Sequence, residues 1–175
     1  MGNRHQHDLF RLETMPQYLS ASDGTELERY RSGKAGPDRE AKRAWLDRLR
    51  SDSDAGRRWR RVRLVEHPVS EYVRYSCEWG YTDNSAAGEE VRILDLADAP
   101  AGTEWLRAAG DFYLVDGAAA AMKYDMLGAF EYATPIRGPL LAAFIAISEA
   151  AWSLAVPFPR RWADHPELQR PPASS

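Results

Sequence analysis

The spacing of apolar side chains divides the chain into alternating stretches and helical stretches. Val62 and Leu64 alternate with arginines between residues 57 and 66, which predicts a half-buried strand. Residues 39–50 repeat apolar side chains every three or four positions, which predicts an amphipathic helix. Residues 140–154 show the same spacing with a wider apolar stripe, which predicts a helix buried on much of its surface. A third helix is predicted at 70–80, with Ser70 as its N-cap. Further strands are predicted at 90–96, 112–115, 119–124 and 129–134, with Asp116-Gly117 as a hairpin turn.

This order of elements predicts an α+β fold. Successive strands joined by short turns favour a mostly antiparallel sheet of four to five strands, with the helices at 70–80 and 140–154 packed on one face. A length of 175 residues is typical of one domain with one core of useful size. We therefore assign 1–175 to a single domain, with an ordered core at about 9–168 and loose ends at 1–8 and 170–175.

Composition narrows the expected partners and compartment. The formal charge of −3 gives no general attraction to nucleic acid or to an anionic membrane. The longest apolar run, 140–147, is far shorter than the ~20 residues of a membrane span. The N-terminal residues contain no apolar stretch typical of a secretory signal. The single cysteine, Cys77, leaves no internal disulfide framework, so we expect a cytoplasmic location.

Several motifs resemble those of a known family. They are Arg74-Tyr75, Glu78-Trp79-Gly80-Tyr81, Asn84-Ser-Ala-Ala-Gly88-Glu89, Val91-Arg92-Ile93-Leu94, Asp111-Phe-Tyr-Leu-Val-Asp116 and Met122-Lys-Tyr-Asp125. From about residue 10 to residue 168, the chain resembles a family of actinobacterial proteins catalogued as domain of unknown function 6879. The resemblance implies no settled activity. The resemblance also implies a gene context, in which family members are encoded next to helix-turn-helix regulators and very small partner proteins. That context suggests a regulatory role by association only.

A weaker resemblance is to one half of a phospholipase-D-like unit, through residues 88–94 and 111–124. That unit uses a His-x-Lys-x4-Asp signature, in which the histidine is the nucleophile on phosphorus. Lys123 matches the lysine, but Ala121 stands where the histidine is required. A degenerate half of this fold would therefore lack the chemistry.

The first candidate site is a polar pocket at the end of the 70–80 helix. Arg74 and Glu78 are four residues apart and lie on the same helix face, with Tyr81 one turn further along. Arg74 can bind an anion and Glu78 can act as a base, with Tyr81 or Tyr124 assisting. The simpler interpretation is an intrahelical ion pair worth about 0.3–0.5 kcal/mol beside a capped loop. The complete candidate ligand-binding set is Arg74, Glu78, Tyr81, Asn84, Glu89, Lys123 and Trp152.

We expect neither a metal nor a cofactor. Asp116 and Asp125 lie near strand ends, where carboxylates can bind a cation, but turn chemistry explains both positions more simply. The histidines are scattered and show no zinc-binding spacing. Cys77 falls on the predicted core side of its helix, where a structural thiol is a simpler interpretation than a nucleophile.

These residues favour a non-catalytic small-molecule-binding or regulatory partner protein, linked to a helix-turn-helix regulatory or biosynthetic gene cluster. Its pocket is expected between the 70–80 helix, the 83–88 loop and the 111–124 hairpin. One alternative is a small biosynthetic enzyme, in which Arg74 anchors an anion and Glu78 is the general base. Another is a nucleic-acid-contacting accessory that uses the basic stretch 57–63. The residues for that contact are Arg57, Arg58, Trp59, Arg60 and Arg61. The ligand, any protein partner and the oligomeric state are left open.

Overall fold

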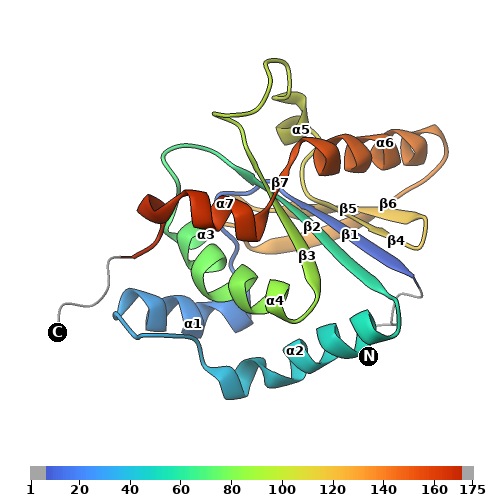
Figure 1. Ribbon diagram of the computed structural model, residues 1–175. Helices are drawn as coiled ribbons and strands as arrows, with labels where there is room; N and C mark the ends of the chain where they lie inside the picture. The colour runs from blue at the N-terminus through green and yellow to red at the C-terminus, as the bar shows by residue number, and fades with distance from the viewer. Residues whose placement is uncertain (1–6, 171–175) are drawn as a thin grey trace.

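A mixed sheet of seven strands organises the protein, in the order β6-β5-β4-β1-β2-β3-β7 (Figure 1). The computed structural model describes residues 7–170, with the backbone alone for residues 21–23. The strands are β1 (Asp8–Glu13), β2 (Arg58–Val65), β3 (Glu89–Asp95), β4 (Phe112–Val115), β5 (Ala118–Tyr124), β6 (Phe130–Ile136) and β7 (Val156–Pro157). The α+β class is confirmed, but the sheet is larger than predicted.

The first three strands are parallel and are joined by helical crossovers. Two helices, α1 (Ala21–Arg31) and α2 (Arg39–Asp54), connect β1 to β2. A second run of helix, made of α3 (Glu71–Tyr75), η1 (Ser76–Tyr81) and α4 (Thr82–Ala86), connects β2 to β3. The prediction of a mostly antiparallel sheet of four to five strands is therefore wrong. Turn signals reveal hairpins, whereas parallel pairing joins segments that are far apart in sequence.

The second half of the sheet is antiparallel. β4, β5 and β6 form a meander, and β4 pairs with β1, so that Phe112 lies opposite Leu12. The predicted hairpin turn at Asp116-Gly117 is confirmed. Both residues have positive φ, 48° and 84°, as the tight turns of twisted hairpins require.

Helices cover both faces of this sheet (Figure 1). One face packs against α5 (Trp105–Ala108) and α6 (Pro139–Leu154), and Leu12 and Val62 lie in the same apolar cluster as Ala151 of α6. The other face packs against α1–α4 and α7 (Phe158–Asp164), and Ile93 clusters with Cys77 of η1. The prediction that the 70–80 and 140–154 helices share one face is wrong. Periodicity shows which side of a helix is apolar, but not which face of the sheet it covers.

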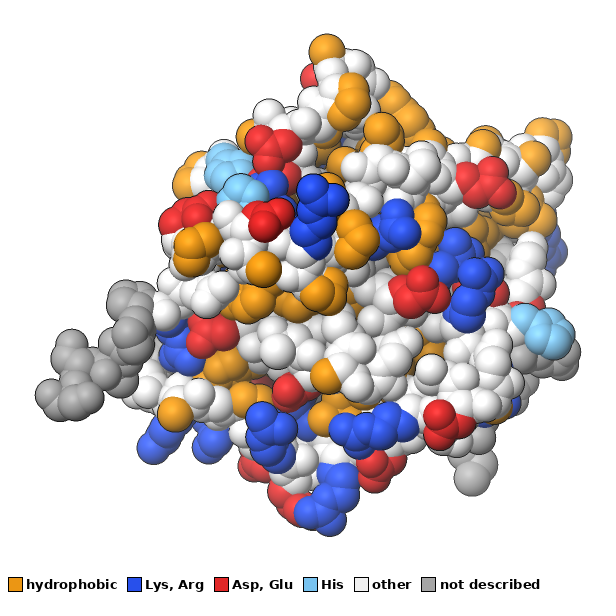
Figure 2. Space-filling model, viewed as in Figure 1, with side chains coloured by type: hydrophobic (Ala, Val, Ile, Leu, Met, Phe, Trp, Pro, Cys, Tyr) orange, Lys and Arg blue, Asp and Glu red, His pale blue; other side chains and the backbone are white. Residues whose placement is uncertain are grey.

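The two sides also differ at the surface (Figure 2). Apolar side chains gather around α5 and α6, where Leu140 and Ile145 are exposed, whereas charged side chains follow α2. Asp8 belongs to β1 and Arg170 is bonded to Glu78, so these two residues of the predicted loose ends have defined partners. Residues 1–6 and 171–175 of those ends lie outside the described residues. Within residues 7–170, the helices are too short or too polar for a membrane crossing.

Candidate functional site

The helix that begins after Ser70 is longer than predicted and changes its pitch. Ser70 caps it as expected, with its Oγ accepting the backbone N–H of Val73 at 3.1 Å. From Ser76 to Tyr81 the turns widen to π-helical geometry, and α4 then continues the helix through most of the expected 83–88 loop. Such wide turns insert a residue and change which side chains face the sheet. Tyr81 thereby lies over the sheet.

A cavity of about 870 Å³ lies between the sheet and helices α1–α4. Its floor is formed by Arg11 and Glu13 of β1 and by Arg61 of β2. Its walls are largely aromatic: Tyr18, Trp45, Tyr72, Tyr75, Tyr81, Tyr124 and Phe130. This size is within the range of pockets that hold small molecules. We refer to it below as the cavity.

The rim of the cavity depends on a close approach between two loops. The backbone N–H of Leu19 donates to the carbonyl of Gly128 at 2.8 Å. Gly128 has a φ of 90°, and a Cβ there would lie 2.4 Å from the carbonyl oxygen of Gln17. Only glycine therefore lets the β5–β6 turn meet the segment after β1 at this distance.

A network of buried charges surrounds Glu13 in the floor. Its Oε1 accepts from Nη1 of Arg11 at 2.9 Å and from Nη1 of Arg61 at 2.6 Å. Its Oε2 accepts from the Tyr81 hydroxyl at 2.6 Å. Arg63 is fully buried, and its Nη1 lies 3.9 Å from the same Oε2. One carboxylate thus has three guanidinium groups around it.

Glu89 extends this network to the helices. Its Oε1 accepts from Nε of Arg61 at 2.8 Å, and its Oε2 accepts from Nδ2 of Asn84 at 2.7 Å. The Asn84 Oδ1 in turn accepts from the Trp45 indole at 3.2 Å. These bonds join β2, β3, α2 and α4, so the position of each polar group depends on several elements.

The titratable groups in and around the floor do not change their protonation state near neutral pH. Burial by itself would raise the pKa of Glu13, but the three surrounding arginines lower it to about 2. Burial raises the pKa of Tyr81 and of Tyr18 well above the usual phenol value, and the charge of Glu13 adds to both shifts. Glu13 therefore stays ionised and both phenols stay protonated. A general acid or base works best with a pKa near the working pH, and these three groups are not tuned in that way.

Three of the residues predicted for the site line the cavity, and a fourth supports it. Tyr81, Asn84 and Tyr124 form part of its wall. Glu89 lies behind Asn84 and holds its side-chain amide. The structure thus brings together the helical run and the β4–β5 hairpin, as the sequence predicts.

Arg74 and Glu78 do not line the cavity, and both bind the C-terminal segment instead. Nη1 of Arg74 donates to the carbonyls of Glu167 and Leu168, each at 3.2 Å. The Glu78 carboxylate accepts from Nη2 of Arg170 at 2.9 Å. The predicted convergence of Arg74 and Glu78 on a shared hollow with the 83–88 segment is not formed. The two side chains lie on the side of the helical run that faces the C-terminal segment.

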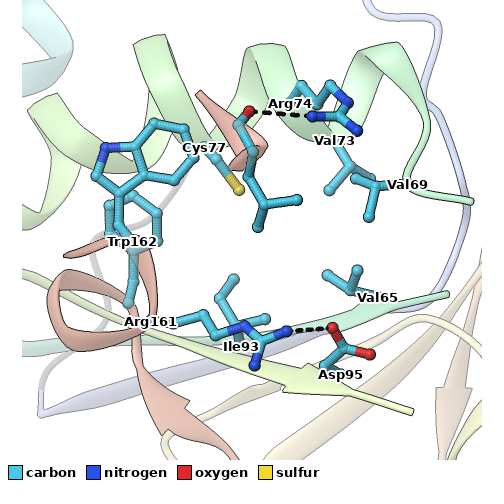
Figure 3. Close-up of a pocket in the computed structure, with 11 residues that line it drawn as sticks. Val65, Val69, Val73, Arg74, Cys77, Ile93, Asp95, Arg161 and Trp162 are labelled. Atoms are coloured by element: carbon cyan, nitrogen blue, oxygen red, sulfur yellow. Dashed lines mark hydrogen bonds and ion pairs between the residues drawn. The ribbon is translucent and has the colours of Figure 1, made fainter. Parts of the chain in front are cut away.

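Arg74 borders a separate gap of about 20 Å³, shown in Figure 3. Its lining is mostly apolar and includes Val65, Val73, Cys77, Ile93, Phe158 and Trp162. A space of this size holds about one water molecule. Burial raises the pKa of the Cys77 thiol to about 12, so the thiol stays protonated. We interpret this gap as packing space under α7, with Cys77 as a structural residue.

Lys123 and Trp152 lie away from the cavity. Trp152 belongs to α6, and its ring centre lies 4.2 Å from the guanidinium carbon of Arg92. Lys123 is an exposed residue of β5 that pairs with Tyr132 of the edge strand β6. Both positions are on the α6 side of the sheet.

The basic stretch predicted for nucleic acid does not form one surface. Neighbouring residues of β2 alternate between the two faces. Nε of Arg60 donates to Asp8 at 3.0 Å on the α6 side, whereas Arg61 belongs to the cavity floor. Trp59 is buried, and its indole donates to Asp52 at 3.0 Å. Ion pairs and burial occupy groups that the nucleic-acid hypothesis needs to be free.

The most important part of the site was missed by the sequence analysis. Arg11 and Glu13 lie in β1, a segment for which the sequence analysis proposes no site residue. The available signal was their alternation with Phe10 and Leu12, because a strand with one apolar face and one charged face needs charged partners if it becomes central. β2 supplies those partners in register, since Arg11 pairs with Arg61.

Comparison with known proteins gives a family but no activity. A model of a family described as a domain of unknown function (DUF6879) matches residues 2–163. The chain belongs to this family. The match extends from β1 into α7 and includes the whole lining of the cavity. No curated protein and no solved structure matches the chain. The DUF6879 description names no reaction, so function has to be argued from the site.

The described residues also contain no group of three or more His, Cys, Asp or Glu side chains placed to hold a metal ion. In the DUF6879 floor, Glu13 and Glu89 are instead bound by arginine, tyrosine and asparagine side chains.

Proposed function

We propose that this protein binds a small molecule in the cavity without transforming it. The observation that carries the proposal is a preformed cavity of about 870 Å³ whose polar floor is already held in place by ion pairs. A ligand entering such a site does not have to order the side chains that it meets, so less binding free energy is lost.

The composition of the cavity supports the same function. Ligand pockets are usually aromatic and apolar, with a small number of placed polar groups that fix orientation. Here Tyr72, Tyr75 and Tyr124 belong to the aromatic wall, while Arg11 and Arg61 are the placed polar groups.

The protonation states argue for binding rather than proton transfer. Glu13 has a pKa of about 2, and the pKa of Tyr81 is well above the usual phenol value. The enzyme hypothesis named Arg74 and Glu78, which bind the C-terminal segment outside the cavity. No specific observation favours that second function.

Binding in this cavity suits a regulatory protein. α1 and α2 supply Thr25, Glu26, Ala41 and Lys42 to its lining. A ligand that contacts these helices only in the folded state stabilises them by mass action. Their stability could then report whether the cavity is occupied.

Ligand screening with a blocked cavity tests the proposal. Ala41 lines the cavity and Ala44, in the same helix, does not, so Ala41→Trp places an indole in the cavity and obstructs it, and Ala44→Trp is its matched control. We expect compounds from a fragment library to raise the melting temperature of the wild type and of Ala44→Trp, but not of Ala41→Trp. The proposal is wrong if every hit binds all three proteins equally, or if none binds. Circular dichroism confirms that both variants are folded.

A further inference from the structure

We infer that the ligand carries an acidic oxygen group, a carboxylate or a phosphate, attached to a planar ring. Its oxygens would lie against Arg11 and Arg61, and its ring among the tyrosines. This inference rests on the proposed function, because it concerns the same cavity.

The acceptor groups of the floor are bonded to neighbouring side chains and buried. Glu13 accepts from Arg11, Arg61 and Tyr81, and Glu89 accepts from Arg61 and Asn84. Both carboxylate side chains are only 3 % exposed, so a ligand that brought only donors would find little of their remaining lone-pair capacity within reach.

The carboxylates of the outer wall are used as well. Asp38 accepts the backbone N–H of Glu40 at 3.0 Å and thereby caps α2. Glu26 accepts the backbone N–H of Asp38 at 2.9 Å and pairs with Arg29 at 3.1 Å. Free acceptor capacity is therefore small around the cavity.

Donor capacity in the floor is not used up. Each guanidinium has five N–H groups, and Arg61 directs its Nε to Glu89 and its Nη1 to Glu13. Arg11 pairs with Glu13 through Nη1, and its side chain keeps 18 % of its surface exposed where it lines the cavity. A ligand that supplies acceptor oxygens satisfies these donors with charge-assisted hydrogen bonds.

The preference for an acidic ligand group follows from these donors and acceptors and not from the net charge of the cavity. Arg11, Lys42 and Arg61 balance Glu13, Glu26 and Asp38 around the lining. Lys42 is already paired with Asp83 at 3.2 Å and also donates to the backbone carbonyl of Trp79, so two of its three donors are used. The two arginines of the floor are therefore the groups that a ligand oxygen can reach with donors to spare.

The aromatic wall begins where these arginines end. The guanidinium carbon of Arg11 lies 5.4 Å from the centre of the Tyr18 ring. Tyr18 meets Tyr124 edge to face at 5.0 Å and Tyr72 at 5.8 Å. A planar ring packs favourably against such faces and edges. The cavity thus joins a site for an acidic group to a site for a flat ring.

Paired probes test the acidic group. We would titrate the full chain calorimetrically with naphthoate and its neutral partner naphthamide, and with adenosine monophosphate and its neutral partner adenosine. We expect at least one acid to bind about tenfold more tightly than its neutral partner, a difference of about 1.4 kcal/mol. The pair that shows the difference identifies the source of the oxygens as a carboxylate or a phosphate.

A charge-conserving variant tests whether the acidic group binds at Arg11. Arg11→Lys keeps the charge that balances Glu13 but loses the planar fork that binds two oxygens at once. We expect it to bind the preferred acid at least about tenfold less tightly. Arg92→Lys, on the α6 face, is the matched control and should leave affinity unchanged. Melting temperatures show whether both variants remain folded.

The outcomes separate the inference from the proposed function. Neutral partners that bind as tightly as the acids overturn the inference, as does an Arg11→Lys variant with unchanged affinity. If only neutral or cationic fragments bind, and Ala41→Trp blocks them, the ligand class is wrong while the binding function stands. If nothing binds in a manner that Ala41→Trp blocks, both are wrong.

Discussion

The two faces of β1 and β2 come from the same strands and have opposite chemistry. The α6 face presents Phe10, Leu12, Val62 and Leu64. The cavity face presents Arg11, Glu13, Arg61 and Arg63. The first set stabilises the fold by removing apolar area from water. The second set is costly to bury, and ion pairs of this kind are often no more stabilising than apolar residues of similar size. The comparison teaches that burial of the apolar face accounts for stability, whereas the charged face needs another explanation, and the ligand binding proposed above supplies one.

The largest effect is expected from removing the central carboxylate. Glu13→Ala leaves Arg11, Arg61 and Arg63 close together and buried without their common partner. Breaking a buried ion pair in this way costs about 3–5 kcal/mol. Urea denaturation measures the loss in the free energy of unfolding. A loss below about 1 kcal/mol would show that the charges are better solvated than their burial indicates.

A substitution at Leu12, next to Glu13 in β1, tests the apolar face of the same strand. Leu12 is fully buried, and Leu12→Ala should cost about 2–5 kcal/mol through lost burial and a residual cavity. The same denaturation experiment measures it. In contrast to Glu13→Ala, this variant should leave the affinity for a cavity ligand unchanged, because Leu12 faces α6. Weaker binding would mean that the two faces are coupled through the strand.

Acid should weaken the charged face selectively. The folded-state pKa of Glu13 is about 2, below the value of 4.5 for an unperturbed glutamate. Its contribution to stability is therefore present above about pH 4.5 and is lost as the pH falls towards 2. Denaturation at several pH values should give a smaller pH dependence in this window for Glu13→Gln than for the wild type. Leu12→Ala should keep the wild-type pH dependence, and an identical pH dependence in all three proteins contradicts the prediction.

A smaller loss of stability is expected from removing the charge of Arg92, which lies on the α6 face of the sheet. Arg92 stacks on Trp152 and also donates to its carbonyl oxygen at 2.9 Å. Arg92→Met keeps much of the side-chain length and should cost about 0.5–1 kcal/mol, the usual value of a partly exposed cation–π contact. Thermal denaturation measures it. No change in melting temperature would show that this contact is not stabilising.

The smallest effect is expected at Lys123. It is exposed on β5 and lies on the α6 side. Lys123→Ala should change stability by less than about 0.5 kcal/mol and should not affect ligand binding. A clear loss of binding would show that Lys123 belongs to the ligand-binding site, as the sequence predicted.

Local patterns predict much of the fold. Apolar spacing at 39–50 and 140–154 predicts α2 and α6, and Asp116-Gly117 predicts the β4–β5 turn, because periodicity and turn chemistry depend only on neighbouring residues. The parallel pairing of β1 with β2 is not predicted, since 44 residues separate Glu13 from Arg58. The floor is missed for the same reason, because Arg11 and Glu13 become part of a site only when β1 pairs with β2.

The sequence by itself determined that β1 and β2 each have one apolar face and one charged face, because side chains alternate along any strand. Only the tertiary structure decided that the two charged faces lie side by side beneath the helices. Long-range pairing places Arg11 beside Arg61, and the π-helical turn brings Tyr81 down onto Glu13. A charge on a strand is an ordinary surface residue until another segment buries it, and burial is what converts these residues into the floor of a cavity.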